Sequence, residues 1–451
     1  MPNTVQFNAE LPVIKNSDAL WERAQGLIPA GTQTLAKGPT QFSKGVAPKY
    51  LVRGKGAQVW DADGNEYLDY NMGIGPIILG YCHPEVDEAI RRQLEDGIVF
   101  SLMHPLEIEL AELMRECIPN TESVRFSKTG CDVTSAAVRL ARAFTQREKV
   151  LCCGYHGWHD WYIATTDRNA GIPACVAELT HTFNYNAIDS VIDAIDEATA
   201  CVILEPFVFE RERDNFLAEL RKVCDQSGAL LIFDEMWTGF RCALGGAQAF
   251  FGVHADLCLF SKAMANGMPI SAITGRKEVM SRLEEDVFFF TTFGGETLSL
   301  AASIACIDFI RSHGVTPHIA AIGQRLLDGL NRIIADLGID YLSMAGYPFR
   351  TMVNFASVAG DPLAMKTLVQ QELIRRGILW SGIHNLCYAH TQADIDYTLA
   401  AYAEVLPIVK KAVESENIRS FLKGEMLQPV FRKTGHFKTK PKPTARAAST
   451  K

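Results

Sequence analysis

The stretch ALLIFDEMWTGFR, residues 229–241, begins with five apolar residues and continues into Asp234 and Glu235. A strand that is apolar at every position is buried on both faces, which is typical of a parallel sheet covered by helices on both sides. Further short apolar runs are SVRF (123–126), KVLCC (149–153), CVILE (201–205), DLCLF (256–260) and ISAIT (270–274). We therefore predict that these runs form one mostly parallel sheet.

Amphipathic stretches alternate with these runs and predict the helices of an α/β fold. They lie at 85–97, 106–117 and 133–144, and after residue 315 at 319–338, 365–377 and 394–413, with a strand near 352–356. The segment 50–71 carries Asp-Gly-Asn between alternating strands and predicts a hairpin or meander. We expect the two ends of the chain to meet in a small α/β domain beside a large central one.

The predicted domain boundaries follow from this change of pattern. We assign 1–80 to the small domain, 81–315 to the large domain and 316–425 to the C-terminal part of the small domain. Residues 426–451 contain no acid and are rich in Lys, Pro and Thr. This composition predicts a disordered basic tail.

The composition excludes several classes of protein. Lys and Arg number 44 against 52 Asp and Glu, so the net charge of -8 gives no electrostatic reason to expect nucleic acid. No apolar run approaches the ~20 residues that span a bilayer, and the first residues lack a signal-peptide pattern. The 12 cysteines are scattered without a CxxC motif. We therefore expect reduced thiols, no metal site, no membrane partner and a cytoplasmic location.

Polar residues follow the predicted strands, at the edge of the sheet where ligands bind in open parallel folds. Asp234 ends one strand and Lys262 follows another, ahead of a turn with Gly267 and Pro269. A lysine held there in a desolvated place would have a lowered pKa and could form a Schiff base; the alternative is a surface lysine.

Asp234 needs a cationic partner, because an unpaired charge at the end of a buried strand is costly. A protonated pyridine nitrogen would serve, and Met236, two residues further along the same face, would press on such a ring. The alternative is an aspartate satisfied by neighbouring backbone or by Arg241.

The turn Thr129-Gly130-Cys131 opens a predicted helix and offers free N–H groups to a phosphate. Tyr155, in a Gly-flanked aromatic loop after KVLCC, could cover the second face of the ring. Each feature alone has an ordinary structural explanation. Together they describe a flat cationic ring with an aldehyde and a phosphate, which is pyridoxal phosphate.

These motifs resemble those of the class III aminotransferases, within the fold-type I enzymes that use pyridoxal phosphate, and most of all the glutamate-1-semialdehyde 2,1-aminomutase subgroup. The similarity extends from IPAGTQT (28–34) through DADGNEYLDYNMGIGPIILGYCHPEV (61–86) to YAHTQADIDYTL (388–399). The resemblance implies a mostly parallel seven-stranded sheet between helices. It also implies that Lys262 forms the Schiff base and that Asp234 pairs with the pyridine nitrogen.

The resemblance implies further contacts with the cofactor. Gly130 and Cys131 would bind the phosphate through backbone N–H groups, and Tyr155 would stack on the ring with His156 beside it. Thr292 in TTFGGE matches a threonine that reaches the phosphate from a neighbouring subunit. A homodimer with shared active sites follows from that match.

The predicted function is the transfer of an amino group from a small-molecule donor to a carbonyl acceptor. One alternative is aminomutase activity, in which the amino group moves within one carbon skeleton; another is a catalytically silent scaffold with the same fold. Candidate substrate contacts are Lys37, Glu205 and His384, although Glu205 could pair with Arg241 and His384 could be solvated. Lys37 stands where the subgroup has an arginine, which removes two-point carboxylate binding and leaves room for a keto or amino sugar. The expected carbonyl acceptor is a keto sugar or a keto or aldehyde acid.

Overall fold

The computed structural model describes residues 7–207 and 210–428. The chain divides into two compact units. Unit 1 contains the described residues of 1–87 and 309–430, and unit 2 contains residues 88–308 without 208 and 209. Both ends of the chain thus contribute to unit 1. The proposed boundaries at 81 and 315 stay predictions, and the predicted tail lies, from residue 429 onward, outside the described residues.

Unit 2 is built on a seven-stranded sheet with the strand order β4-β10-β9-β8-β7-β5-β6. Its strands are β4 (Ser123–Ser127), β5 (Lys149–Cys153), β6 (Thr180–Thr182), β7 (Thr199–Leu204), β8 (Leu230–Asp234), β9 (Leu257–Phe260) and β10 (Ser271–Gly275). All neighbouring pairs are parallel except those of β10, which is antiparallel to both β4 and β9. Six strands therefore run in one direction, and their carboxyl ends share one edge of the sheet.

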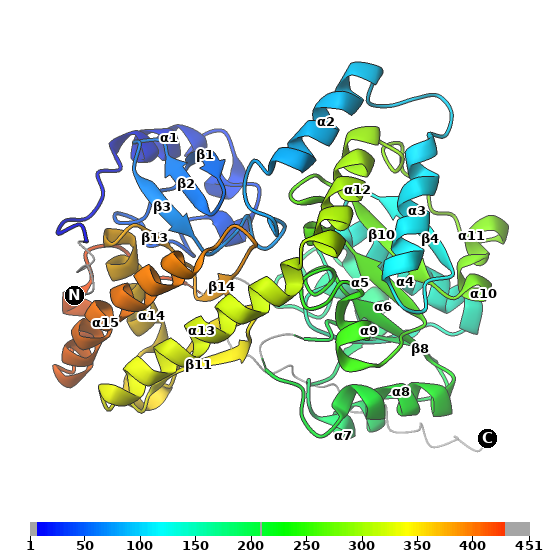
Figure 1. Ribbon diagram of the computed structural model, residues 1–451. Coiled ribbons are helices and arrows are strands. Elements are labelled where there is room, and N and C mark those ends of the chain that lie inside the picture. Colours follow the sequence, from blue (N-terminus) through cyan, green and yellow to red (C-terminus); the bar gives the residue numbers. More distant parts are fainter. Residues whose placement is uncertain (1–6, 208–209, 429–451) are drawn as a thin grey trace, which may run out of the picture. The chain divides into compact units, whose positions relative to one another are not determined.

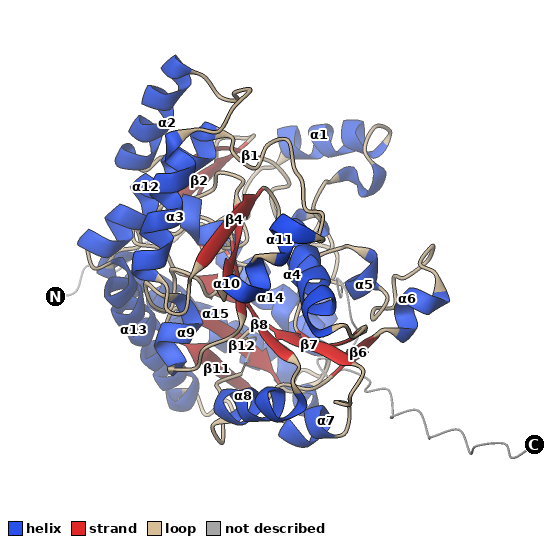
Figure 2. Ribbon diagram, turned by 90° about the vertical axis from the view of Figure 1, so that its right-hand side faces the viewer, coloured by secondary structure: helices blue, strands red, loops and turns tan. Residues whose placement is uncertain are grey.

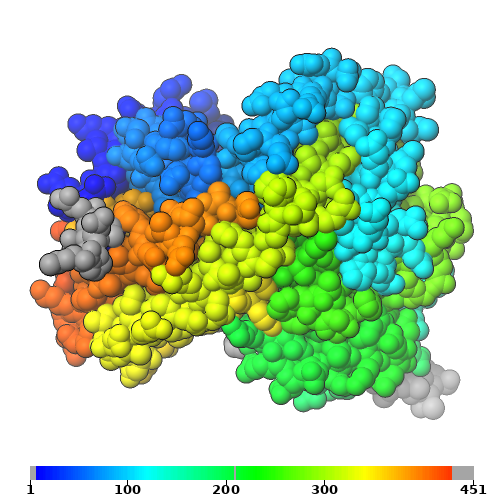
Figure 3. Space-filling view, viewed as in Figure 1, coloured from blue at the N-terminus to red at the C-terminus, as the bar shows by residue number. Residues whose placement is uncertain are grey.

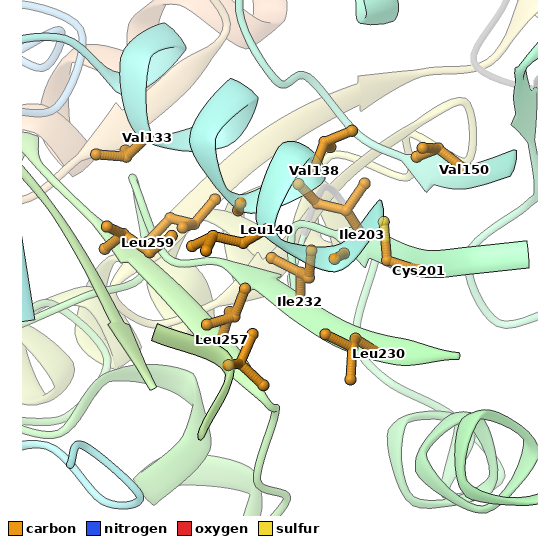
Figure 4. Close-up of a cluster of buried hydrophobic side chains, with 14 of the residues drawn as sticks. Val133, Val138, Leu140, Val150, Cys201, Ile203, Leu230, Ile232, Leu257 and Leu259 are labelled. Atoms are coloured by element: carbon orange, nitrogen blue, oxygen red, sulfur yellow. The ribbon is translucent and has the colours of Figure 1, made fainter. Parts of the chain in front are cut away.

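Helices flank the sheet of unit 2 (Figure 2). They are α3 (Pro105–Cys117), α4 (Gly130–Thr145), α5 (Asp160–Ile163), α6 (Ala174–Glu178), α7 (Ile188–Ile192), α8 (Phe216–Ser227), α9 (Gly246–Phe251), α10 (Lys277–Met280) and α11 (Arg282–Glu285). Helix α4 lays Val133, Val138 and Leu140 onto Ile203, Ile232 and other fully apolar strand residues (Figure 4). This burial stabilises both layers and fixes the start of α4 above the sheet edge.

Unit 1 joins elements from both ends of the chain, coloured blue and yellow to red in Figure 1. A four-stranded sheet has the order β1-β2-β3-β13, and a three-stranded sheet has the order β11-β12-β14. The strands are β1 (Leu51–Lys55), β2 (Gln58–Asp61), β3 (Glu66–Asp69), β11 (Leu342–Tyr347), β12 (Arg350–Phe355), β13 (Ile378–Leu379) and β14 (Ile383–Asn385). The helices are α1 (Lys15–Gln25), α13 (Val315–Asp336), α14 (Pro362–Arg375) and α15 (Gln392–Glu414).

Two helices cross the boundaries between the units. They are α2 (Pro84–Asp96) and α12 (Thr297–Ser312). Within the described residues no single helix is long and apolar enough to span a membrane, and only α12 and α13 taken together as a bent pair reach that length and composition. The cysteines form no disulfide among themselves in this part of the chain.

Lys366 is a largely buried amine on α14 in unit 1. Its Nζ lies 2.8 Å from the position that a Cβ on Gly382 would occupy. Burial lowers the pKa of Lys366 to about 8, from 10.5 for a free lysine. The folded chain therefore binds fewer protons here than the unfolded chain between about pH 8 and 10.5, and its stability rises with pH across that window.

We expect Lys366→Met to raise the free energy of unfolding by about 2 kcal/mol at pH 7, because the charged amine no longer has to be buried. The difference in the free energy of unfolding between the variant and the native chain should shrink toward zero at pH 10.5. Urea unfolding at pH 7 and at pH 10.5 measures this difference. Lys411→Met on α15 is the matched control and should change neither value. Equal effects of Lys366→Met at both pH values would contradict the burial of a charged amine.

Candidate active site

The carboxyl edge of the seven-stranded sheet gathers most of the residues predicted to carry chemistry. They are Thr129 after β4, Tyr155 and His156 after β5, Glu205 after β7, Asp234 at the end of β8 and Lys262 after β9. Asp234 is in register with Leu259 on the adjacent strand β9, and Lys262 follows Leu259 by three residues, just past the end of that strand. All of these residues belong to unit 2, which can therefore form the site from its own sheet.

Asp234 and His156 form a buried pair at the centre of this edge. Asp234 Oδ2 lies 2.7 Å from His156 Nδ1, and the side chains are 1% and 0% exposed. His156 Nδ1 donates to this carboxylate, which can only accept, and His156 Nε2 lies 3.1 Å from Cys153 O. Asp234 Oδ1 accepts a hydrogen bond from Met236 N at 3.1 Å. The carboxylate is thus held by two donors, and each of its oxygens keeps a further lone pair.

Lys262 is held at a tight turn. Its φ of 47° lies in the left-handed region, which non-glycine residues rarely adopt. The preceding Ser261 fixes the turn by donating from Oγ to Ile270 O at 2.6 Å, and Asn266 and Gly267 continue it with positive φ. Such strained backbone is concentrated at functional sites, and the lysine is partly buried rather than fully solvated.

The start of α4 forms the turn that was predicted to bind phosphate. Thr129 is the N-cap and forms a capping box with Asp132. Gly130 and Cys131 are the first two helical residues, whose N–H groups have no acceptor within the helix. Burial raises the pKa of the Cys131 thiol, so the side chain stays neutral beside an anion. A Cβ on Gly130 would lie 3.0 Å from Met236 Sδ, which places Met236 against this turn.

The loop after β5 depends on two glycines with positive φ. A Cβ on Gly157 would lie 2.5 Å from Cys131 Sγ, and one on Gly154 would lie 2.9 Å from Glu205 Oε1. Glu205 Oε1 accepts a hydrogen bond from Tyr155 N at 2.7 Å. The half-exposed Tyr155 ring makes an edge contact with Tyr162, at 5.6 Å between centroids. Glu205 therefore supports the loop that carries Tyr155.

Three other predicted site residues do not follow strands of this sheet. Thr292 is exposed in the segment 288–296 of unit 2, and Lys37 is exposed in unit 1. His384 is fully buried in unit 1, where its ring nitrogens contact Thr351 Oγ1 and Tyr402 OH at 3.2 and 3.0 Å. Burial lowers the pKa of His384 to about 3, so the ring is neutral. The alternative of a solvated histidine is wrong.

Sequence reasoning missed two features of this site. The first is Gly157, which leaves room for Cys131 Sγ because it has no Cβ. The two glycines of GYHGWH were the sequence pattern that could have indicated this close approach. Lys128 and Glu296 form a largely buried ion pair beside the turn, at 2.7 Å. No local pattern could reveal that pair, because its members are 168 residues apart.

Comparison with known proteins places this chain in a family. The model of the family described as "Aminotransferase class-III" matches residues 42–347, more than half of the chain. A 3-aminobutyryl-CoA aminotransferase of Cloacimonas acidaminovorans is 35% identical over 89% of this chain and 99% of its own length. A glutamate-1-semialdehyde 2,1-aminomutase of Acetivibrio thermocellus is 38% identical over 71% of this chain and 79% of its own.

A solved structure supports the same assignment. The FumI protein of Sphingopyxis sp. MTA144, solved in its PLP internal aldimine form, is 29% identical and superimposes with a TM-score of 0.82. It covers 90% of this chain and 99% of its own. The predicted fold-type I architecture and the predicted class of enzyme are thereby confirmed. The chain belongs to the class III aminotransferases.

Proposed function

We propose that this chain transfers an amino group from a small-molecule amine to a carbonyl acceptor, with Lys262 as the residue that moves the proton. The observation that carries the proposal is the placement of Asp234 at the end of β8 and of Lys262 just after the adjacent β9, at the sheet edge where Asp234 also forms its buried pair with His156. Pyridoxal phosphate is the cofactor of the family, and when bound it supplies an aldehyde for amine exchange and a ring that withdraws electrons.

The residues at the sheet edge fit this cofactor. The N–H groups of Gly130 and Cys131, at the positive end of the α4 dipole, would hold the phosphate. Asp234 has a lone pair left for a protonated ring nitrogen, and its burial makes that charge pair strong. Tyr155 would cover one face of the ring. These three roles are part of the proposal.

The protein residues divide the proton chemistry. Lys262 Nζ would remove a proton from the carbon that carries the amine and would then deliver a proton to the aldehyde carbon of the cofactor. Asp234 would keep a proton on the ring nitrogen, and His156 holds Asp234 in place by its hydrogen bond at 2.7 Å. Glu205 and the two glycines of the loop hold the backbone of Tyr155, whose ring would then cover the cofactor.

The donor we favour is an amine whose amino group is on the β-carbon or further from the carboxyl carbon. The similar enzyme of Cloacimonas acidaminovorans is named for 3-aminobutyryl-CoA, which is such an amine. Lys37 cannot bind a carboxylate through two parallel hydrogen bonds as an arginine does. A keto sugar or a keto or aldehyde acid remains the proposed acceptor.

A donor screen tests this function. Each candidate amine is mixed with the cofactor-loaded enzyme, and the spectral change from the aldehyde to the amine form of the cofactor is followed. We expect β-amino substrates, 3-aminobutyryl-CoA among them, to react faster than α-amino acids of equal length. A chain that reacts with no amine would support the silent scaffold instead.

Aminomutase activity is the second candidate, because a relative 38% identical carries that name. The test is incubation with glutamate-1-semialdehyde alone. We expect no 5-aminolevulinate, and its formation without a second substrate would replace the transferase proposal by the mutase.

We also propose that the chain acts as a homodimer in the cytoplasm, with Thr292 of each subunit reaching the phosphate site of the other. Unit 2 exposes an unusual set of large apolar side chains on two segments, namely Ile98, Val99, Phe100, Leu102, Met103 and Ile108, and Phe288, Phe290 and Phe293. The segments are adjacent, since Thr297 N donates to Ile98 O at 3.0 Å. The cyan surface around α3 in Figure 3 includes the first of them. Exposed apolar patches of this kind mark protein interfaces.

We expect Phe290→Asp to convert the dimer to a monomer at micromolar concentration, because it buries a charge in the interface. Sedimentation velocity measures the change. Val358→Asp is the matched control, since Val358 is 87% exposed in unit 1 and should leave the assembly intact. A Phe290→Asp variant that stays dimeric would contradict this interface.

A further inference from the structure

The largely buried ion pair of Lys128 and Glu296 connects two segments to which the proposed site assigns roles. Lys128 lies in the turn between β4 and α4, directly before Thr129, and Glu296 lies four residues after Thr292. Lys128 Nζ is 2.7 Å from Glu296 Oε2, and the side chains are 15% and 11% exposed. Removing one partner of such a pair leaves a buried charge without compensation, so both residues matter to the local structure.

Ser299 extends this pair to a third segment. Its Oγ lies 2.6 Å from Glu296 Oε2 and accepts a hydrogen bond from Lys128 Nζ at 3.1 Å. The same Oγ lies 3.2 Å from Pro269 O, in the turn that follows Lys262. The cluster of Lys128, Glu296 and Ser299 therefore contacts the Thr129–Cys131 turn (the phosphate turn), the turn that follows Lys262 and the segment that carries Thr292.

Glu296 is held in one orientation and in one charge state. Its Oε1 accepts from Leu298 N at 2.7 Å, so the side chain also caps the start of α12. Burial acts to raise the pKa of Glu296, but the hydrogen bonds from Lys128 and Ser299 outweigh it and the pKa is lowered. The carboxylate is thus ionised at neutral pH and pairs with a charged Lys128.

The phosphate turn is fixed from two directions. On one side Asp132 Oδ2 accepts from Thr129 N at 2.8 Å and from Ser127 Oγ at 2.7 Å. On the other side the side chain of Lys128 is anchored to Glu296. Because the directions of the Gly130 and Cys131 N–H groups follow from the path of this turn, the anchor decides how well they meet an anion.

We propose that Lys128 and Glu296 are positioning residues, which hold the Thr129–Cys131 turn ready for the phosphate and connect it to the segment that each subunit lends to its partner. This inference rests on the proposed function. It differs from a direct role, in which the ammonium of Lys128 itself would bind the phosphate.

The two roles predict opposite signs for one variant. Glu296→Gln releases Lys128 from its counter-charge, so a lysine that bound phosphate directly would bind it more tightly. If the pair positions the turn, the same variant binds the phosphate more weakly, because the turn loses its anchor.

The experiment compares the dissociation constants of pyridoxal phosphate and of pyridoxal, which lacks the phosphate, for the full-length apoprotein by fluorescence titration. The ratio of the two constants gives the increase in affinity that the phosphate group contributes, which we call the gain from the phosphate. We expect Lys128→Gln and Glu296→Gln each to reduce this gain by about tenfold. Lys128→Arg should retain it, and the exchanged pair Lys128→Glu with Glu296→Lys should restore part of it.

Arg221→Gln is the matched control. It breaks the ion pair of Arg221 and Asp256 at 2.9 Å, beside the amino end of β9, and should lower the unfolding temperature without changing the gain. The inference would be overturned if both single variants kept the native ratio of the two dissociation constants, or if Glu296→Gln bound pyridoxal phosphate more tightly. It would also be overturned if a variant lost the same factor of affinity for pyridoxal phosphate and for pyridoxal. A native chain with no gain from the phosphate would instead overturn the proposed function itself.

Discussion

Replacing Lys262 with alanine should lower kcat for amino transfer by about 10⁴-fold or more, because the variant loses the amine that moves the proton. The local fold should survive, since Ser261 Oγ still donates to Ile270 O and Ala263 to Ala265 remain buried. The stopped-flow rate of the first half-reaction with a reactive amine measures the loss directly.

Two controls separate a catalytic loss from a structural one. Added methylamine should restore part of the activity of Lys262→Ala, because a small free amine can take over the proton transfer. Lys277→Ala on α10 removes an exposed lysine of the same unit and should retain full activity. A Lys262→Ala variant within tenfold of the native rate would contradict the assignment of this lysine.

The second large effect is expected at Asp234. Asp234→Asn keeps an oxygen for Met236 N but removes the buried negative charge, so the ring nitrogen would no longer hold its proton. We expect kcat to fall by about 10²- to 10³-fold, as for other losses of a buried electrostatic contact in an active site. Steady-state kinetics at saturating cofactor measures this fall.

The control for this prediction is Asp225→Asn, which neutralises an exposed acid on α8 and should leave kcat unchanged. The absorbance spectrum provides a second readout, because loss of the ring proton alters the bound cofactor even before substrate is added. Retention of native kcat and of the native spectrum by Asp234→Asn would show that Asp234 does not face the ring.

Much of the sheet could be predicted because its strands are apolar throughout. KVLCC was predicted residue for residue as β5, and ALLIFD differs from β8 by one residue at its start. Strand β6, Thr180–Thr182, was missed because Thr-His-Thr has neither length nor an apolar run. It is a strand because it pairs in parallel with β5, which is a tertiary effect.

The residues at the sheet edge could be predicted for the same reason, since the end of a buried strand is visible in the sequence. Asp234 and Lys262 were found in this way. The contacts that these residues make join positions far apart in the chain, and the sequence does not show which side chains pair. The hydrogen bond of Asp234 joins residues 78 apart, and His384 is buried through Tyr402 and Thr351 rather than by its own neighbours.

Lys262 is the residue to which we assign the covalent link with pyridoxal phosphate. Reduction of the loaded enzyme with borohydride, followed by peptide mapping with mass spectrometry, locates the lysine that carries the cofactor. We predict one pyridoxyl group per chain, on Lys262. A label on any other lysine, or no label on a chain that still exchanges amines, would contradict the account.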